Sequence, residues 1–77
     1  MSEPKRQPSD ELLEVISNNI KQHRKDQSLT QEKLAETCGF HPTFISLVER
    51  KKRNITISTV EVIASALEVP PYSLLKP

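Results

Sequence analysis

The sequence has few of the residues from which metal centres and redox sites are built. Its 77 residues include one cysteine, two histidines and no tryptophan. A single cysteine excludes an internal disulfide and a cysteine-rich metal site, and neither His23 nor His41 has further ligands at a metal-binding spacing. We therefore expect no metal, no cofactor and two surface or partly buried imidazoles. Cys38 is expected to fill the core as a small apolar group.

Long hydrophobic runs are also missing. No stretch approaches the roughly 20 apolar residues that span a bilayer, and no signal-peptide core is present. The lone thiol suits a reducing compartment. These features predict a cytoplasmic protein that has no membrane partner.

Neither sign of charge predominates, because 11 basic and 10 acidic residues give a formal net charge of only +1. The distribution of charge is more informative than its total. Residues 50–53 form an unbroken basic run, whereas residues 55–69 contain no lysine or arginine. One edge of a small domain can then contact phosphate and the opposite edge a partner subunit. The alternative is that the basic run is a solvated turn without a ligand.

Helical periodicity predominates, and no segment alternates like a β-strand for long enough to build a sheet. Residues 1–8 contain two prolines and no apolar periodicity, which predicts a flexible N-terminal arm. Residues 9–77 are expected to form one all-α domain of five helices. The apolar residues of the first helix recur at helical spacing: Leu12, Leu13, Ile16 and Ile20.

Capping residues predict the bounds of the next two helices. Thr30 is a good N-cap for a short helix over residues 31–37. Gly39, the only glycine, can end that helix because it adopts the left-handed conformation at little cost. Pro42 suits the first turn of a third helix, where its missing N–H is not needed.

A fourth helix and a last helical turn follow the basic run. The fourth helix is capped by Thr56 or by Ser58, whose spacing to Glu61 matches a capping box. The prolines at positions 70 and 71 end that helix, and residues 72–75 can form the fifth.

The second and third helices, joined by a glycine-containing turn, match a helix-turn-helix arrangement. Ala35 is small enough for the third helix to cross close over the second, and Gly39 turns the chain sharply. Apolar side chains fix the crossing angle: Leu34, Ile45 and Val48. A third helix held outward at a fixed angle can enter a major groove about 12 Å wide.

With these residues in place, the sequence resembles the Xre/Cro/phage-repressor family of helix-turn-helix regulators over residues 16–75. The resemblance is carried by residues 29–35 (LTQEKLA), 44–50 (FISLVER) and 66–69 (ALEV). Within that family, residues 43–46, 49–50 and 53–57 look most like the controller proteins of bacterial restriction–modification systems. The resemblance implies a compact five-helix, lambda-repressor-like DNA-binding domain.

The resemblance also implies roles in holding the DNA backbone. Gln31, at the start of the second helix, would bind a phosphate, where free N–H groups favour an anion in any case. Arg24 would form a largely structural ion pair with Glu49. Further phosphate contacts would come from Lys51, Lys52 and Asn54.

The same resemblance implies which residues read bases. They lie on the outer face of the third helix and beyond its end: Thr43, Ser46, Leu47, Arg50 and Arg53. An arginine can bind guanine in bidentate fashion, whereas Leu47 can only press on a thymine methyl group. Pro42 and Leu47 depart from the polar residues common in the family, so direct readout is expected to be sparse and DNA shape to matter more. Phe44 either packs against the second helix or lies along the DNA backbone.

A single recognition helix covers few base pairs, so we expect a homodimer that reads two half-sites. The apolar residues near the C-terminus exceed what five short helices can bury, and the resemblance places the dimer interface around the fourth and fifth helices. The candidates are Ile57, Val69, Pro70, Tyr72 and Leu75. The alternative is that they complete the monomer core, as Leu74 is expected to do.

The predicted function is regulation of transcription by sequence-specific binding of a homodimer to a palindromic double-stranded operator. The resemblance favours the controller protein of a restriction–modification system that acts on its own promoter. The alternatives are a phage-type or other Xre-family repressor and the antitoxin of a toxin–antitoxin pair. We expect a bacterial or phage-encoded protein that is nucleoid-associated when bound.

Catalysis is not expected. No nucleophile set, paired-carboxylate pocket or phosphate-cradling glycine loop is present, and the chain is too short for a sizeable cleft. Activation at low concentration followed by repression at high concentration would require a contact with RNA polymerase, for which the sequence identifies no surface.

Overall fold

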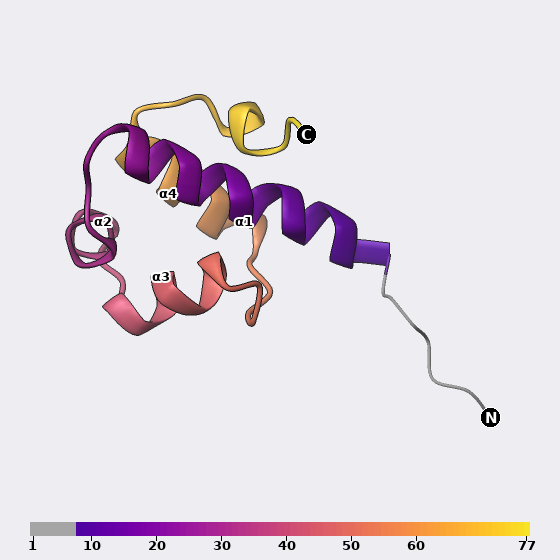
Figure 1. The fold of residues 1–77 in the computed structure, drawn as a ribbon, viewed down its shortest axis with the longest axis horizontal. Helices are drawn as coiled ribbons and strands as arrows, with labels where there is room; N and C mark the ends of the chain where they lie inside the picture. Colours follow the sequence, from indigo (N-terminus) through magenta and orange to yellow (C-terminus); the bar gives the residue numbers. More distant parts are fainter. Residues whose placement is uncertain (1–7) are drawn as a thin grey trace.

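The computed structural model describes residues 8–77, which form four α-helices and a final 3-10 helix (Figure 1). The elements are α1 (Pro8–Asp26), α2 (Gln31–Cys38), α3 (Pro42–Glu49), α4 (Ile57–Leu67) and η1 (Pro71–Leu74). The all-α class is confirmed, with a 3-10 helix as the last element. Helix α1 begins at Pro8, which the sequence analysis places in the arm, and the remainder of that arm lies outside the described residues. No helix in residues 8–77 is long and apolar enough to cross a membrane.

Helix α1 runs along the length of the domain and contacts α3, α4 and η1 (Figure 1). In this view α3 lies below α1 and η1 above it, and α2 packs against α3 and α4. The large side chains at the centre are fully buried: Ile20, Leu34, Ile45, Ile63, Leu67 and Leu74. Burial of each contributes about 1.5–3 kcal/mol. This core fixes α2 and α3, which are too short to be stable alone.

All four α-helices end in the same way. A left-handed residue follows each of them: Ser28 (φ 58°), Gly39 (φ 79°), Lys51 (φ 61°) and Glu68 (φ 60°). The next residue donates its N–H to the carbonyl five positions earlier: Leu29 to Arg24 (3.0 Å), Phe40 to Ala35 (2.9 Å), Lys52 to Leu47 (2.9 Å) and Val69 to Ala64 (3.0 Å). This is the Schellman arrangement. The left-handed Gly39 is confirmed, and three residues that are not glycine share its conformation.

Side chains cap the beginnings of α2, α3 and α4. Thr30 Oγ1 accepts the Lys33 N–H (3.0 Å), as expected, and Thr56 Oγ1 accepts the Thr59 N–H (3.0 Å). Because Thr56 is the cap of α4, Ser58 lies inside its first turn, and the predicted capping box with Glu61 is wrong.

The cap of α3 comes from a residue that the sequence analysis left without a role. His41 Nδ1 accepts the N–H of Thr43 at 3.1 Å. Imidazole is an unusual capping group, since Ser, Thr, Asp and Asn lead at this position. The bond requires that Nδ1 carry no proton, so the neutral tautomer with N–H at Nε2 caps the helix.

Candidate nucleic-acid interface

The crossing of α2 and α3 has the geometry that the helix-turn-helix interpretation requires. Ala35, Ile45 and Val48 are fully buried where the two helices meet. A Cβ added to Gly39 would meet no atom within 4 Å, so the turn needs glycine for its backbone conformation and not for space. The crossing therefore holds α3 at a fixed angle, with one face on the core and the other directed away from it.

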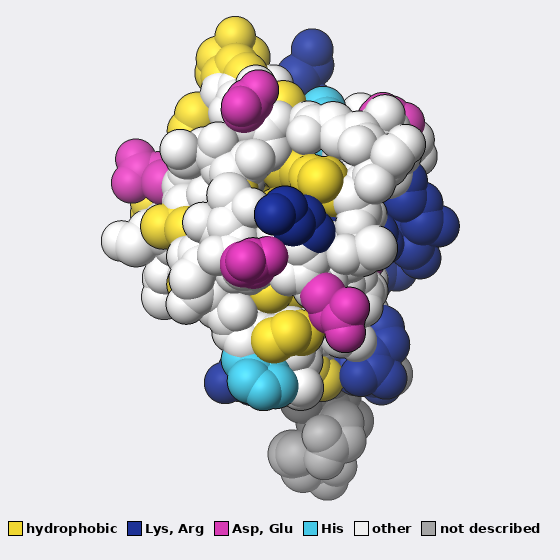
Figure 2. Space-filling model, turned by 90° about the vertical axis from the view of Figure 1, so that its left-hand side faces the viewer, with side chains coloured by type: hydrophobic (Ala, Val, Ile, Leu, Met, Phe, Trp, Pro, Cys, Tyr) yellow, Lys and Arg dark blue, Asp and Glu magenta, His cyan; other side chains and the backbone are white. Residues whose placement is uncertain are grey.

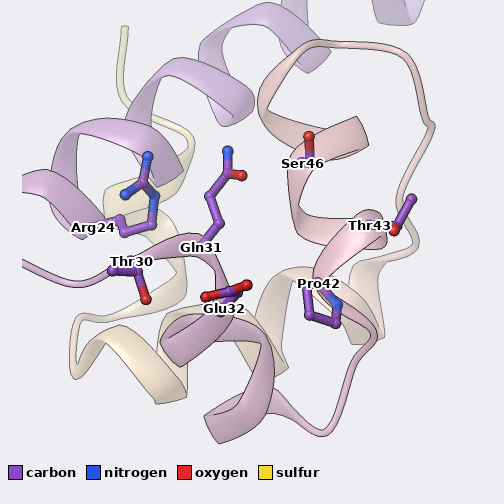
Figure 3. Close-up of a pocket in the computed structure, with 7 residues that line it drawn as sticks. All are labelled: Arg24, Thr30, Gln31, Glu32, Pro42, Thr43 and Ser46. Atoms are coloured by element: carbon purple, nitrogen blue, oxygen red, sulfur yellow. The ribbon is translucent and has the colours of Figure 1, made fainter.

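The outer face of α3 carries the polar side chains predicted to read bases. Thr43 and Arg50 are exposed, whereas Ser46 and Leu47 are half-buried. Thr43 and Ser46 also line an open groove of about 540 Å³ between the start of α2 and the first turns of α3 (Figure 3). Its full lining is Arg24, Thr30, Gln31, Glu32, Pro42, Thr43 and Ser46.

A buried ion pair ties the end of α3 to α1. Arg24 Nε and Nη2 donate to the two oxygens of Glu49, at 2.6 and 2.9 Å. Arg24 Nη1 donates to the carbonyl of Leu29 at 2.7 Å. The Glu49 side chain is only 2% exposed, so these partners take the place of water around its carboxylate. The pair implied by the family resemblance is thus present, in bidentate form.

Gln31 joins this pair to the rim of the groove. Its Nε2 donates to Glu49 Oε1 at 3.0 Å. An amide nitrogen carries two N–H groups, so one remains for a ligand while the other is held by Glu49. Gln31 stands at the first position of α2, where backbone N–H groups have no partner within the helix. This arrangement suits an anion such as a phosphate.

The basic run forms an exposed loop after α3. Lys and Arg side chains lie mainly along one edge of the face shown in Figure 2. The four residues of the run do not share one direction, because Lys51 Nζ lies 3.8 Å from Glu14 Oε2 on α1. Asn54 also lies on the α1 side, where it lines a small hollow with Leu12 and Ile55. The loop therefore divides between α1 and α3.

Phe44 is half-buried and packs against Phe40, with the ring centroids 5.0 Å apart in an edge-to-face arrangement. It belongs to the partly buried apolar residues around the core, and its ring partner lies in the turn after α2 and not on α2 itself. The guanidinium carbon of Arg53 lies 5.6 Å from the Phe44 centroid. Arg53 follows the end of α3, as the sequence analysis has it, and its side chain folds back against the start of that helix.

An apolar groove lies on a different side, between α1, the start of α4 and η1. Its volume is about 390 Å³, and it is lined by Leu12, Ile16, Ile55, Thr56, Ile57, Val60, Glu61, Pro71 and Leu75. Of the five predicted interface residues, Ile57 and Leu75 line this groove, and Ile57 is 83% exposed.

The other three predicted interface residues lie outside the groove lining. Tyr72 and Pro70 are exposed. Val69 is half-buried against the core of its own chain. Leu12, which is 49% exposed on α1, is the most exposed of the large apolar groove residues that the sequence analysis did not assign to an interface. The spacing of Leu12 from Ile16 and Ile20 predicts that the three side chains share one face of α1. It does not show that the core covers Ile16 and Ile20 and leaves Leu12 exposed.

A family model described as helix-turn-helix (HTH_3) matches residues 20–74. The control protein C.SmaI of Serratia marcescens is 42% identical over 65 residues, which cover 84% of this chain and 77% of that protein. The crystal structure of the hypothetical transcription factor NHTF from Neisseria has a TM-score of 0.84 at 39% identity and covers 99% of this chain and 88% of that one. The restriction–modification controller protein C.AhdI from Aeromonas hydrophila has a TM-score of 0.77 at 29% identity, covering 80% of this chain and 94% of that one.

Proposed function

Since the chain belongs to the helix-turn-helix family and is a DNA-binding transcriptional regulator, we propose that it acts as a homodimer on a palindromic operator. We further propose that it is the controller protein of a restriction–modification system and regulates its own promoter. Similarity to control proteins over most of the chain supports the second part. Those relatives are regulators by name, and the proposal includes no catalytic step.

The observation that carries the proposal is the exposed outer face of α3 beside the start of α2. In the proposed complex α3 enters the major groove, and Thr43, Ser46 and Arg50 reach base edges. Gln31 and the first N–H groups of α2 hold a backbone phosphate. Leu47 is apolar and half-buried, and because it can form no hydrogen bond its proposed contact is with a thymine methyl group. Further phosphate contacts in the proposal come from Lys51, Lys52 and Asn54.

The apolar groove supplies the proposed dimer interface. Two copies related by a two-fold axis bring the same patch together, and Ile57 is the most exposed apolar side chain in it. Stable interfaces bury about 800 Å² on each partner. Each Å² of apolar area removed from water contributes about 25 cal/mol of favourable free energy. Leu75 lines the groove, so the proposed interface reaches the residues after η1.

The interface is tested by one charged substitution and a matched control. Ile57→Asp places a carboxylate in the groove and introduces an acidic residue in the first turn of α4, where the helix dipole favours a negative charge. We expect it to convert the dimer to a monomer in sedimentation equilibrium. Val62→Asp, at another exposed position of the same helix, should leave the dimer intact. A dimer that tolerates Ile57→Asp would rule out this face.

DNA binding is tested by fluorescence anisotropy with a duplex that carries the protein's own promoter. Arg50→Ala should weaken binding about 5- to 100-fold if the guanidinium reads a guanine. Thr43→Ala should weaken binding to the promoter more than to a mixed-sequence duplex. Lys21→Ala, at an exposed position on α1, is the control for loss of a charge and should change little. Equal binding of all variants would contradict the proposed docking.

The role in a restriction–modification system is tested by identifying the genes that lie beside the one for this protein. Genes for an endonuclease and a methyltransferase beside this one support a controller protein, and their absence leaves a general Xre-type or phage-type repressor. Capture of a toxin protein in the absence of DNA would favour the antitoxin alternative. Any activating role adds a contact with RNA polymerase, and binding to a promoter places the protein at the nucleoid.

A further inference from the structure

Three side chains from different parts of the chain form a stack beside the recognition helix. Phe40, in the turn between α2 and α3, packs edge-to-face on Phe44 at 5.0 Å and 69°. Arg53, in the loop before α4, lies over the Phe44 ring at 5.6 Å. The stack connects the turn, the first turn of α3 and the basic loop.

We infer that Phe44 is a positioning residue for Arg53, and that the stacked guanidinium contacts DNA beside the first turn of α3. This inference rests on the proposed docking of α3. The Arg53 guanidinium has five N–H donors, and its contact with the Phe44 ring acts through its positive charge and uses none of them as a hydrogen bond. The donors therefore remain free for a pair of acceptor atoms on DNA, either phosphate oxygens or guanine O6 and N7.

Other observations indicate that this contact decides where the Arg53 side chain lies. Arg53 is exposed, and within residues 8–77 the Phe44 ring is the one partner of its side chain. The loop backbone is held just before it, where the Lys52 N–H bonds to the Leu47 carbonyl. A long cation on a loop otherwise loses rotamer freedom when it binds a ligand. Stacking restricts that freedom before DNA arrives.

The inference is tested with a double-mutant cycle on the full chain. The variants are Phe44→Leu, Arg53→Gln and the double variant, and binding is measured on a duplex selected by the wild-type protein from a randomised library and on a mixed-sequence duplex. Phe44→Leu should weaken binding about two- to fivefold, which is the range expected for an exposed cation–π contact. The loss should vanish in the Arg53→Gln background. Phe44→Tyr, which keeps the ring, should bind like the wild type.

Two measurements separate positioning from a general effect on folding. Urea unfolding of each variant establishes that the binding assays use folded protein, and Phe44→Met replaces Phe44→Leu if the latter does not fold. A second cycle pairs Phe44→Leu with Arg50→Gln. There the loss of affinity in the double variant should equal the product of the fold-losses in the two single variants. Coupling to Arg53 alone supports the positioning role.

The two duplexes identify the acceptor. If Arg53 binds phosphate, Arg53→Gln lowers affinity for both duplexes equally and reduces the slope of log K against log salt by about 0.9. If it binds guanine, the loss is confined to the selected duplex.

The outcomes distinguish this inference from the function on which it rests. If the wild-type chain selects no duplex from the library and does not bind the mixed-sequence duplex, the proposed docking and this inference are both overturned. Binding by the wild type, with Phe44→Leu equally harmful in the presence and absence of Arg53, overturns the inference alone. The same holds if Phe44→Leu leaves binding unchanged.

Discussion

Replacing Arg24 by methionine would leave the nearly buried carboxylate of Glu49 without its main partner. The guanidinium supplies two of the three hydrogen bonds that the carboxylate accepts, and the third comes from Gln31. The two side chains are 11% and 2% exposed, so water can replace little of what is lost. Removal of one partner from a buried ion pair costs about 3–5 kcal/mol. The substitution also leaves the Leu29 carbonyl without the donor from Arg24.

That cost is large against the stability of so small a domain. At about 0.05–0.15 kcal/mol per residue, 77 residues give a free energy of unfolding of about 4–12 kcal/mol. Each kcal/mol shifts the melting temperature of a domain this size by about 4–8 °C. We therefore expect Arg24→Met to lower the Tm by about 12–40 °C and to lose at least a quarter of the stability.

Urea unfolding followed by circular dichroism measures this loss, with two further variants. Arg24→Met/Glu49→Leu removes both charges and should be more stable than Arg24→Met by about 2 kcal/mol, because an apolar pair has no charge to leave unpaired. Lys33→Ala removes an exposed ion pair with Glu36 (3.6 Å) and should have no measurable effect. A cost below about 1 kcal/mol for Arg24→Met, or a double variant less stable than the single one, would refute the reasoning.

Three other substitutions or treatments test local features. Ser28→Gly should raise the free energy of unfolding by about 0.5–1 kcal/mol, because relief of left-handed strain exceeds the entropy cost of glycine; thermal melts would show no gain if φ 58° carries no strain. Thr56→Ala should lower stability by about 1 kcal/mol through loss of the α4 cap, and Ser58→Ala should not, so equal effects would contradict the assignment. Burial raises the pKa of the Cys38 thiol, so iodoacetamide should alkylate it more slowly near pH 8 in the folded chain than after urea unfolding.

The helix-turn-helix could be predicted because its constraints are local and severe. Ala35 is fully buried at the crossing, and Gly39 adopts φ 79°, as their residue types indicate. Ile45 and Val48 recur at helical spacing and both face the core. Each of these positions tolerates few residue types, so the types themselves carry the information.

The features that were missed depend on tertiary structure or on weak local preferences. Ser28, Lys51 and Glu68 adopt left-handed conformations that no glycine marks, since the bond from the following residue stabilises each turn. Thr56 and Ser58 are both good caps, and the register of α4 on the core selects the first. Arg53 is nine positions after Phe44, and only the course of the loop brings them together.

The two arginines also set limits on the half-site that the proposed docking can read. Arg50 follows the last residue of α3, while Arg53 rests against Phe44 near its start. An eight-residue helix is about 12 Å long, which is about three to four base-pair steps. Hydroxyls such as those of Thr43 serve several bases, so discrimination would concentrate where a guanidinium meets guanine. We therefore expect strong base preference at the end of each half-site that Arg50 contacts, and at the other end as well if Arg53 binds guanine and not phosphate, with the steps between them distinguished by how readily they bend.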